Sequence, residues 1–275
     1  MNPSNLYDKR ITFIGAGNMA EALVRGLLGT GSCLAQNLRV SDINEVRLSY
    51  FFETYGISGS TSNTDVVSDA DMIVLAVKPQ AFTDVLSELY RAIPREALII
   101  SIAAGIPAQR IEAAFSAEQK VIRIMPNTPS LIGAGVAAVA AGSYASEADL
   151  EVAEVLLRSV GIVIRVEEPD LDVVTALSGS GPAYVFYLVE ALIKSAATMG
   201  LHRDVARTLV VATVEGAARL LRETGEDAAE LRRRVTSKGG TTEAALNVLN
   251  EAGVAESLIK AVSAARDRSC ELSRM

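Results

Sequence analysis

Hydrophobic residues between positions 10 and 166 come in short runs, separated by stretches with helical spacing. Asp71–Val77 is almost entirely apolar, as expected for a strand buried on both faces of a parallel sheet. Helical patterns stand between such runs, as at Met19–Leu28 and Glu147–Ser159. This alternation predicts strand–helix–strand units and a parallel sheet covered by helices. The predicted strands span residues 10–15, 38–41, 71–77, 97–102, 120–125, 136–140 and 162–166.

The pattern changes after Glu167–Asp170, where strand signals end. Two later segments, Ala183–Ala197 and Val205–Leu221, are apolar around most of their circumference. A helical region of about 100 residues cannot bury that much surface by itself, so we expect a homo-oligomeric interface. The sequence thus predicts two domains, 1–167 and 168–275. The predicted helices span residues 171–177 running on through 182–199, then 203–224, 227–235, 242–250 and 254–272.

Composition favours a packed protein without a nucleic-acid partner. Hydrophobic residues make up 49% of the 275 positions and charged residues 21%, which supplies an ample core. The net charge is −7, and the basic run Arg232–Arg234 is too short to neutralise a nucleic-acid backbone. That run could still meet a cofactor phosphate.

Cysteine usage and the hydropathy pattern favour the cytoplasm. Cys33 and Cys270 are the only cysteines and lie far apart, which fits a reduced protein. The first ten residues lack the apolar core of a signal peptide. Glu190 and Lys194 interrupt the longest apolar run, short of the roughly 20 residues of a membrane span. We therefore expect a soluble, cytoplasmic protein with no membrane partner.

A glycine-rich turn follows the first predicted strand. Ile14-Gly-Ala-Gly-Asn-Met-Ala20 has the G-x-G-x-x-G/A spacing, with Ala20 as the third small residue. Gly15 allows a tight turn, Gly17 allows a pyrophosphate to approach the backbone, and Ala20 allows close helix packing. Because this pattern stands between a predicted strand and a predicted helix, it indicates dinucleotide binding.

The end of the second predicted strand bears on the choice of cofactor. Asp42 stands there, where a carboxylate can accept hydrogen bonds from the ribose 2′-hydroxyl of NAD and would repel the 2′-phosphate of NADP. Asp42 is also suited to cap a helix ahead of Asn44-Glu45. Arg47 and the Arg232–Arg234 run are candidates to pair with a 2′-phosphate. The sequence therefore leaves both NADPH and NADH open.

Two later strand ends carry further polar candidates. Lys78 follows the predicted strand 71–77, while Asn127 and Thr128 lie in the proline-flanked turn Met125–Pro129. Ligands of open α/β sheets bind outside the carboxyl ends of the strands. We therefore expect these residues to face a crevice, with Lys78 near the nicotinamide half of the cofactor. A solvated lysine and ordinary turn chemistry are the alternatives.

Catalytic side chains of the usual kinds are scarce. His202 is the only histidine, and its loop between two predicted helices favours a surface position. No metal-ligand cluster or Ser-His-Asp arrangement is evident, so we expect no metal. The chemistry must then come mainly from a bound cofactor and from positioned dipoles.

Two loops in the second half place small and hydroxyl-bearing residues directly ahead of helices. They are Leu177-Ser-Gly-Ser-Gly-Pro-Ala-Tyr184 and Thr236-Ser-Lys-Gly-Gly-Thr-Thr-Glu-Ala-Ala245. Such loops expose backbone N–H groups and hydroxyl donors to a small anion. Either loop alone is compatible with a plain turn, but after a dinucleotide-binding turn the pair indicates a second anion site.

The chain resembles the pyrroline-5-carboxylate reductase family over nearly its whole length. The matching motifs occur in order, at Gly15–Ala20, Val77–Gln80, Ser101–Gly105, Met125–Pro129, Ser178–Tyr184 and Gly239–Thr242. The resemblance implies an N-terminal α/β Rossmann domain with a doubly wound, mostly parallel sheet, followed by an all-α dimerisation domain. It also implies reduction of L-1-pyrroline-5-carboxylate to L-proline with NADPH or NADH, the last step of proline biosynthesis. In this family the helices of a homodimer interleave and each active site lies between two subunits. Such dimers often form decamers of five dimers.

Individual roles also follow from the resemblance. Ser237, Gly239, Gly240, Thr241 and Thr242 would bind the substrate, whose carboxylate suits a helix N-terminus. Thr242 would lie near the ring nitrogen, with Thr175 and Ser180 lining the same pocket as catalytic residues. A substrate bound as its protonated iminium needs no strong protein acid. The implied cofactor contacts are Ile14, Gly15, Ala16, Gly17, Asn18, Met19, Asp42, Asn63, Ala76, Val77, Lys78, Pro79, Ala103 and Asn127.

The chain departs from the family pattern in two places. Lys238 stands where members commonly carry proline, so the loop is less rigid or carries an added charge near the carboxylate. Asp42 stands where many members have a serine or an Asn-Arg pair, which bears on NADPH use.

Two other functions remain as alternatives. A related imine reductase or β-hydroxyacid dehydrogenase would use a lysine on the first long helix of the second domain. Lys194 lies on such a helix, although within an apolar stretch and after no matching motif. A nucleotide-binding regulatory protein without turnover is the other alternative, but it would have no need of a second anion site.

Overall fold

The computed structural model describes residues 6–115 and 118–274, and the chain contacts group into two compact units. One unit contains the chain up to Ser180 together with the segment from Ala265 onward, and the other is Gly181–Ala264. The first unit contains the whole sheet, and the second is helical.

The described strands form one eight-stranded sheet with the order β3-β2-β1-β4-β5-β6-β7-β8. Neighbouring strands are parallel except for β6 and β7, so the sheet is mostly parallel, as predicted. The order reverses between β1 and β4, and ligands of such sheets bind at the carboxyl ends of the strands flanking that point. The strands are β1 (Ile11–Ile14), β2 (Leu38–Ser41), β3 (Ser58–Ser60), β4 (Met72–Leu75), β5 (Leu98–Ser101), β6 (Val121–Met125), β7 (Gly135–Ala141) and β8 (Gly161–Arg165).

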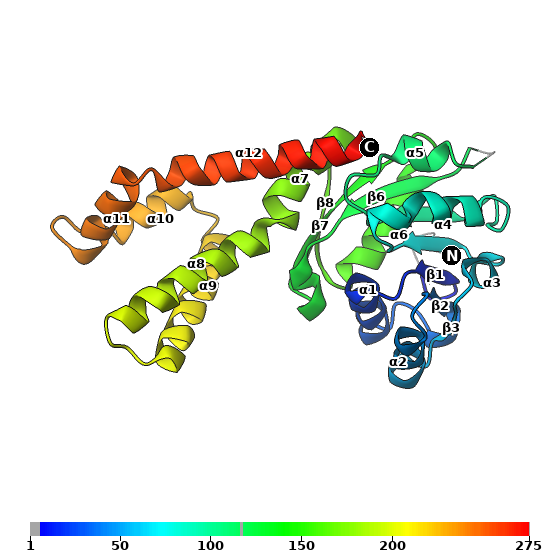
Figure 1. Ribbon diagram of the computed structural model, residues 1–275, viewed down its shortest axis with the longest axis horizontal. Helices are drawn as coiled ribbons and strands as arrows, with labels where there is room; N and C mark the ends of the chain where they lie inside the picture. The colour runs from blue at the N-terminus through cyan, green and yellow to red at the C-terminus, as the bar shows by residue number, and fades with distance from the viewer. Residues whose placement is uncertain (1–5, 116–117, 275) are drawn as a thin grey trace. The chain divides into compact units, whose positions relative to one another are not determined.

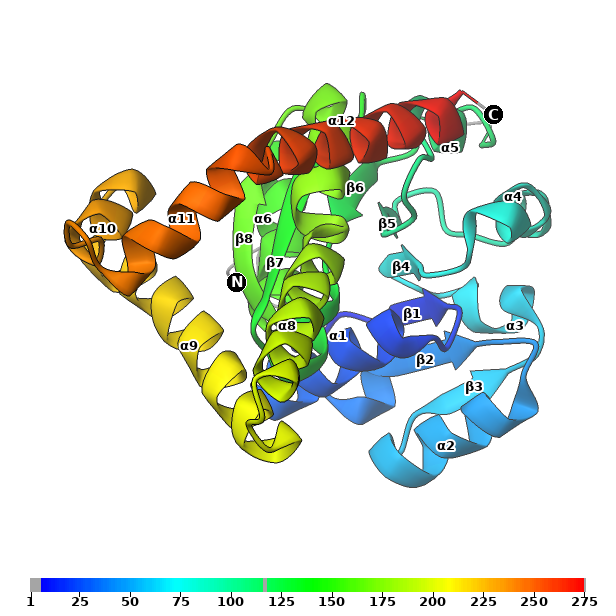
Figure 2. The ribbon, with the colours of Figure 1, turned by 60° about the vertical axis from the view of Figure 1, so that its left-hand side comes forward.

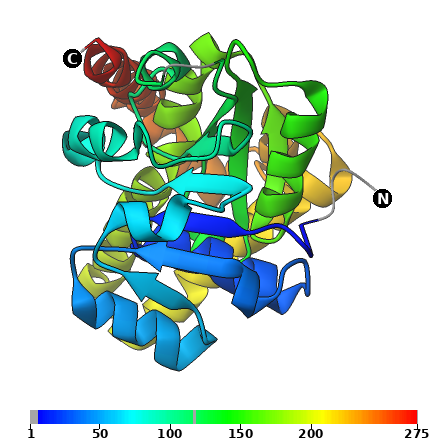
Figure 3. The same cartoon turned by 90° about the vertical axis from the view of Figure 1, so that its right-hand side faces the viewer.

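Helices cover both faces of the sheet because consecutive strand residues face two separate cores. Phe13 packs into one core and Ile14 into the other. Buried residues of α1, α2 and α6 belong to the first core, and those of α3, α4 and α5 to the second (Figures 1 and 3). This doubly wound arrangement explains why the central strands are apolar on both faces. These helices span Asn18–Gly29 (α1), Glu45–Tyr55 (α2), Asn63–Val67 (α3), Phe82–Leu89 (α4), Ala108–Glu112 (α5) and Glu147–Arg158 (α6).

The predicted strands are confirmed to within a few residues at each end, but β3 is absent from the prediction. Its sequence, Ser58-Gly-Ser60, contains no apolar side chain and carries no strand pattern. It joins the sheet through backbone pairing with β2. Gly59 lies so close to β2 that a Cβ atom there would stand 2.9 Å from the Val40 carbonyl oxygen.

The last helix, α12 (Val254–Ser273), ends within the sheet-containing unit. Ser269 Oγ and Cys270 Sγ both donate to the carboxylate of Asp172, at 2.6 and 3.2 Å. Asp172 lies on α7 (Leu171–Val174), so these bonds tie the last turns of α12 to the helix that follows the sheet. In Figure 2, α12 is the red helix that ends beside the label C.

The helical unit contains α8 (Gly181–Thr198), α9 (Arg203–Thr224), α10 (Ala228–Arg234), α11 (Thr241–Glu251) and the first part of α12. All of these helices were predicted and are confirmed. No side chain of α8 is buried, which agrees with the expectation that one chain cannot cover this surface. The exposed apolar residues are Val185, Phe186, Tyr187, Leu188 and Leu192 on α8, and Val205, Leu209, Val211, Leu220 and Leu221 on α9.

The helical run Glu168–Thr198 is long and apolar enough to cross a membrane by length and composition alone. Glu190 and Lys194 therefore do not shorten it below that length, contrary to the expectation from sequence. Only 6% of its apolar window is buried within the chain. One such helix is weak evidence for a membrane, because an apolar helix face also serves protein–protein contact.

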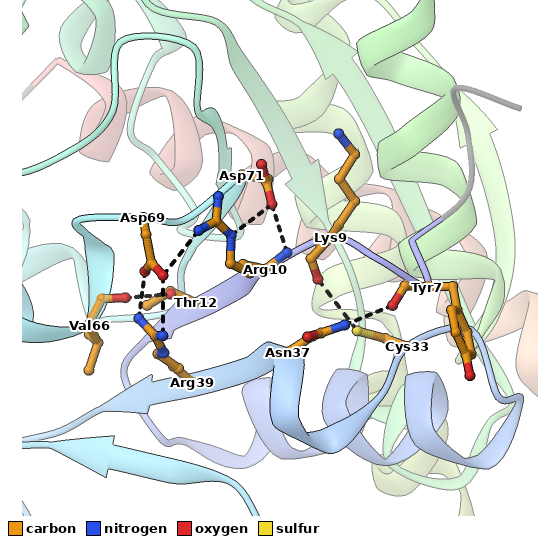
Figure 4. A network of polar contacts seen from close by, with 10 residues as sticks. All are labelled: Tyr7, Lys9, Arg10, Thr12, Cys33, Asn37, Arg39, Val66, Asp69 and Asp71. Atoms are coloured by element: carbon orange, nitrogen blue, oxygen red, sulfur yellow. Dashed lines mark hydrogen bonds and ion pairs between the residues drawn. The ribbon is translucent and has the colours of Figure 1, made fainter. Parts of the chain in front are cut away.

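Ion pairs tie the amino ends of the strands together at the edge opposite the glycine-rich turn (Figure 4). Arg10, just before β1, bonds to Asp69 and Asp71, which precede β4. Arg39 of β2 also donates to Asp69, at 2.5 Å. Because these side chains are a third to a half exposed and so remain in contact with water, each pair contributes about 1 kcal/mol or less to stability.

Candidate functional site

The glycine-rich turn uses its first two glycines for different purposes. Gly15 has a φ of +102°, and a Cβ there would stand 2.7 Å from the Ala76 carbonyl oxygen at the end of β4. Gly17 has an ordinary φ of −74°, and a Cβ there would meet no atom within 4 Å. Gly15 is therefore required by the fold, whereas Gly17 leaves open space beside the backbone, as a pyrophosphate would need.

Gly17 is also the N-cap of α1, and it offers no side chain to satisfy the first N–H groups of that helix. An α-helix has no internal acceptor for these groups, and its dipole favours an anion there. Asn18 and Met19 form the first turn of α1. The turn and the helix together fit the phosphates of a dinucleotide.

The structure gives Asp42 a place beside this turn. Its Oδ2 atom accepts a hydrogen bond from the Ala16 N–H at 2.7 Å, and its Oδ1 atom accepts one from the Asn44 N–H at 2.9 Å. Asn44 is the N-cap of α2 and accepts from the Val46 N–H. The alternative of Asp42 as the helix cap is therefore wrong.

Three of the four arginines proposed for a 2′-phosphate, Arg47, Arg233 and Arg234, already have partners. Arg47 donates to the Ala16 carbonyl oxygen and to Glu21, at 2.8 and 2.7 Å. Arg233 and Arg234 both pair with Glu230 on their own helix, α10.

The other proposed cofactor residues lie at the carboxyl ends of neighbouring strands. Ala76, Val77, Lys78 and Pro79 follow β4, where the Ala76 N–H donates to the Ile14 carbonyl oxygen at 2.8 Å and Lys78 is exposed. Ala103 follows β5. The Asn63 side chain accepts from Ser41 Oγ and donates to Glu88, so its amide is occupied by protein contacts.

A π-helical turn, Thr175–Gly179, joins α7 to α8. The prediction of a loop over residues 177–184 is therefore wrong, because Leu177–Gly179 belong to this turn and Gly181–Tyr184 to α8. The Ser180 N–H donates to the Thr175 carbonyl oxygen at 2.8 Å, which is the i to i+5 bond of this turn. Asn127, after β6, accepts from the Val136 N–H and donates to Ser178 Oγ at 3.4 Å. The structure thus links two of the predicted motifs through Ser178, and π turns are frequent at functional sites.

In the helical unit, the loop ahead of α11 presents a helix N-terminus. Gly240 is the N-cap, so Thr241 and Thr242 are the first two residues of the helix. Gly239 has a φ of +72°, and its N–H donates to the Glu243 carboxylate at 2.7 Å. Ser237 and Lys238 are exposed. The sequence gives no sign of this Glu243 contact, because the contact depends on the fold of the loop.

His202 and Lys194, the remaining candidate side chains, both lie at the surface. His202 is exposed and caps α9 through its side chain. Lys194 is exposed on α8. Within residues 6–115 and 118–274, no cluster of three His, Cys, Asp or Glu side chains suits a metal ion.

The doubly wound sheet and its glycine-rich turn place this chain in the class of Rossmann-type dinucleotide-binding proteins. Residues 10–105 match the family described as NADP oxidoreductase, coenzyme F420-dependent, and residues 168–272 match pyrroline-5-carboxylate reductase dimerisation. The pyrroline-5-carboxylate reductase of Pseudomonas aeruginosa is 43% identical over 265 residues, covering 96% of this chain and 97% of the relative. The chain belongs to the pyrroline-5-carboxylate reductase family, which confirms the resemblance.

Solved structures agree with this membership. A pyrroline-5-carboxylate reductase from Coxiella burnetii is 39% identical with a TM-score of 0.89, covering 97% of this chain and 99% of that one. Pyrroline carboxylate reductase from Plasmodium falciparum, solved with NADP bound, is 28% identical with a TM-score of 0.88. That match covers 97% of this chain and 98% of the other.

Proposed function

We propose that this protein reduces L-1-pyrroline-5-carboxylate to L-proline with NADPH or NADH. The observation that carries the proposal is the presence, in one chain of this family, of the open glycine-rich turn at Gly17 and of a helix N-terminus at Thr241 that has no side-chain cap. The first suits a dinucleotide and the second suits a small carboxylate.

The residues of the first site fit a nicotinamide dinucleotide. Gly17 and the first turn of α1 would hold the phosphates, while Lys78, Ala103 and Asn127 lie at the carboxyl ends of β4, β5 and β6. The cofactor, when bound, supplies the hydride. The contribution of the protein is to fix the distance and angle between the two reactants, which accounts for a large share of such catalysis.

The residues of the second site bind and orient the substrate. The resemblance assigned the carboxylate to Gly240 and Thr241, but the Gly240 N–H donates to the Ser237 carbonyl oxygen at 3.0 Å. The N–H groups of Thr241 and Thr242 would therefore hold the carboxylate, and the Thr242 hydroxyl would bond near the ring nitrogen. Thr175 and Ser180 would line the same pocket. A substrate that binds as its protonated iminium already carries the proton on nitrogen, so its reduction needs no strong acid from this chain.

The match of residues 168–272 to a dimerisation family and the exposed apolar faces of α8 and α9 support a homodimer. Burial against a second copy accounts for these faces without a membrane. We propose a cytoplasmic protein whose two domains, 1–167 and 168–275, serve cofactor binding and dimerisation. Its dimers would assemble into a decamer.

The test is an assay with L-1-pyrroline-5-carboxylate as the sole acceptor. Loss of nicotinamide absorbance should accompany formation of proline, and Gly17→Val should be inactive as the matched control. Correctly folded protein that forms no proline with either cofactor would refute the proposal.

A further inference from the structure

The backbone of Ala16, in the middle of the glycine-rich turn, is held at both of its polar atoms by side chains that follow β2. Asp42 accepts from the Ala16 N–H at 2.7 Å, and Arg47 donates from Nε to the Ala16 carbonyl oxygen at 2.8 Å. We call Asp42 and Arg47 the loop clamp. Because the clamp holds the turn from one side, it fixes the backbone that faces the phosphates.

Arg47 is held in this position from several directions. Its Nη2 atom donates to Glu21 Oε2 at 2.7 Å. Its guanidinium lies 4.9 Å from the ring centre of Tyr50 and 5.3 Å from that of Phe51. The side chain is only 28% exposed. To reach a cofactor phosphate, Arg47 would have to give up these contacts together.

Glu21, in the first turn of α1, is the centre of this arrangement. Tyr50 and Tyr55 donate their hydroxyl groups to its Oε1 atom at 2.8 and 3.0 Å, while Arg47 bonds to Oε2. Burial by itself would raise the pKa of Glu21, but the bonds from Arg47, Tyr50 and Tyr55 outweigh it and lower the pKa. Glu21 therefore carries its charge at neutral pH and attracts Arg47.

Arg47 has no substitute among the loops around it. Residues 15–20, 42–47 and 61–65 follow β1, β2 and β3, and Arg47 is their only basic side chain. Asp42, Glu45 and Asp65 supply negative charge in the same loops. A 2′-phosphate in this region would meet like charge and no uncommitted cation, and like charges are unfavourable at short range.

We propose that Glu21 withholds Arg47 from the cofactor, so that Arg47 stiffens the glycine-rich turn and the site favours a dinucleotide with a free 2′-hydroxyl, NADH over NADPH. The inference rests on the proposed use of a nicotinamide cofactor. Arg47 is then a positioning residue that affects both cofactors equally through Ala16. Glu21, which bonds to Arg47, determines the selectivity.

Calorimetric titration of the whole protein with NADH and with NADPH tests this. Wild type should bind NADH about tenfold more tightly than NADPH. Arg47→Gln should weaken the binding of both cofactors by the same factor. The ratio of the NADPH dissociation constant to the NADH dissociation constant should therefore stay unchanged. Glu21→Gln should lower that ratio by about threefold or more, through tighter NADPH binding by the released arginine. Arg39→Gln, at the opposite end of β2, is the matched control and should change neither cofactor (Figure 4).

Other results overturn the proposal. A selective loss of NADPH binding in Arg47→Gln would mean that this arginine pairs with the 2′-phosphate. The proposal also fails if the ratio of the NADPH to the NADH dissociation constant is below about 3 in the wild type and 2′,5′-ADP binds as tightly as 5′-AMP. An unchanged ratio in Glu21→Gln would show that Glu21 does not restrain Arg47. Because titration needs no turnover, these outcomes are distinct from a failure to form proline.

Discussion

Replacement of Gly17 by valine separates cofactor binding from folding more cleanly than any other change in the glycine-rich turn. The backbone of Gly17, with φ −74° and ψ 178°, lies in the extended region open to every residue. A Cβ there meets no heavy atom within 4 Å. Valine is a poor N-cap, so the change should cost about 1 kcal/mol of stability. The protein should therefore remain folded.

The valine methyl groups would occupy the space through which a pyrophosphate approaches the turn. We expect the dissociation constant for NADH or NADPH to rise at least about 100-fold, which is about 2.7 kcal/mol. Calorimetric titration measures the affinity, and thermal unfolding measures the stability of the same samples.

Gly15→Ala is the matched control with the opposite outcome. Its φ of +102° and a Cβ 2.7 Å from the Ala76 carbonyl oxygen predict a loss of stability, since such backbone strain alone costs about 1–3 kcal/mol. The reasoning is wrong if Gly17→Val binds the cofactor like wild type, or if Gly15→Ala unfolds at the wild-type temperature.

Three further predictions follow from other parts of the chain. Thr242→Ala should lower kcat with little change in cofactor affinity, because a lost hydrogen bond to a buried partner costs about 1–3 kcal/mol; full turnover would remove Thr242 from the mechanism. The protein should be at least a dimer by light scattering, and Phe186→Arg, at a position 66% exposed on α8, should favour monomers, whereas a monomeric wild type would contradict the interface. Burial raises the pKa of Cys33 to about 11, so roughly a thousandth of this thiol is ionised at pH 8, and a thiol reagent should label it only after unfolding. Native Cys33→Ser, which keeps only Cys270, is the control: if it is labelled as rapidly as the native wild type, the fast reaction belongs to Cys270.

Much of the architecture could be read from local patterns, because apolar runs and helical spacing report which faces of an element are buried. β2 (Leu38–Ser41) and α9 (Arg203–Thr224) end where the sequence predicts. β3 could not be found in this way, since a strand of serine and glycine is held by backbone pairing alone. The antiparallel placement of β7 was equally hidden, because hydrophobicity does not encode strand direction.

The glycine-rich turn and the loop before α11 were visible in the sequence because each is a contiguous segment whose glycines set the backbone geometry. The hydrogen-bond partners of individual side chains were not visible in the sequence. From the sequence, Asp42 was a candidate to bind the ribose 2′-hydroxyl of NAD and Arg47 a candidate to bind the 2′-phosphate of NADP. In the structure both side chains bond to the backbone of Ala16. Glu21 carried no signal at all, and Ser178 lay within a predicted motif whose contact with Asn127 the sequence did not reveal. Hydrogen bonds between elements depend on the direction of each side chain and on the distance between the elements. Only tertiary packing determines that direction and that distance. The sequence alone determines which residues are available to form the bonds.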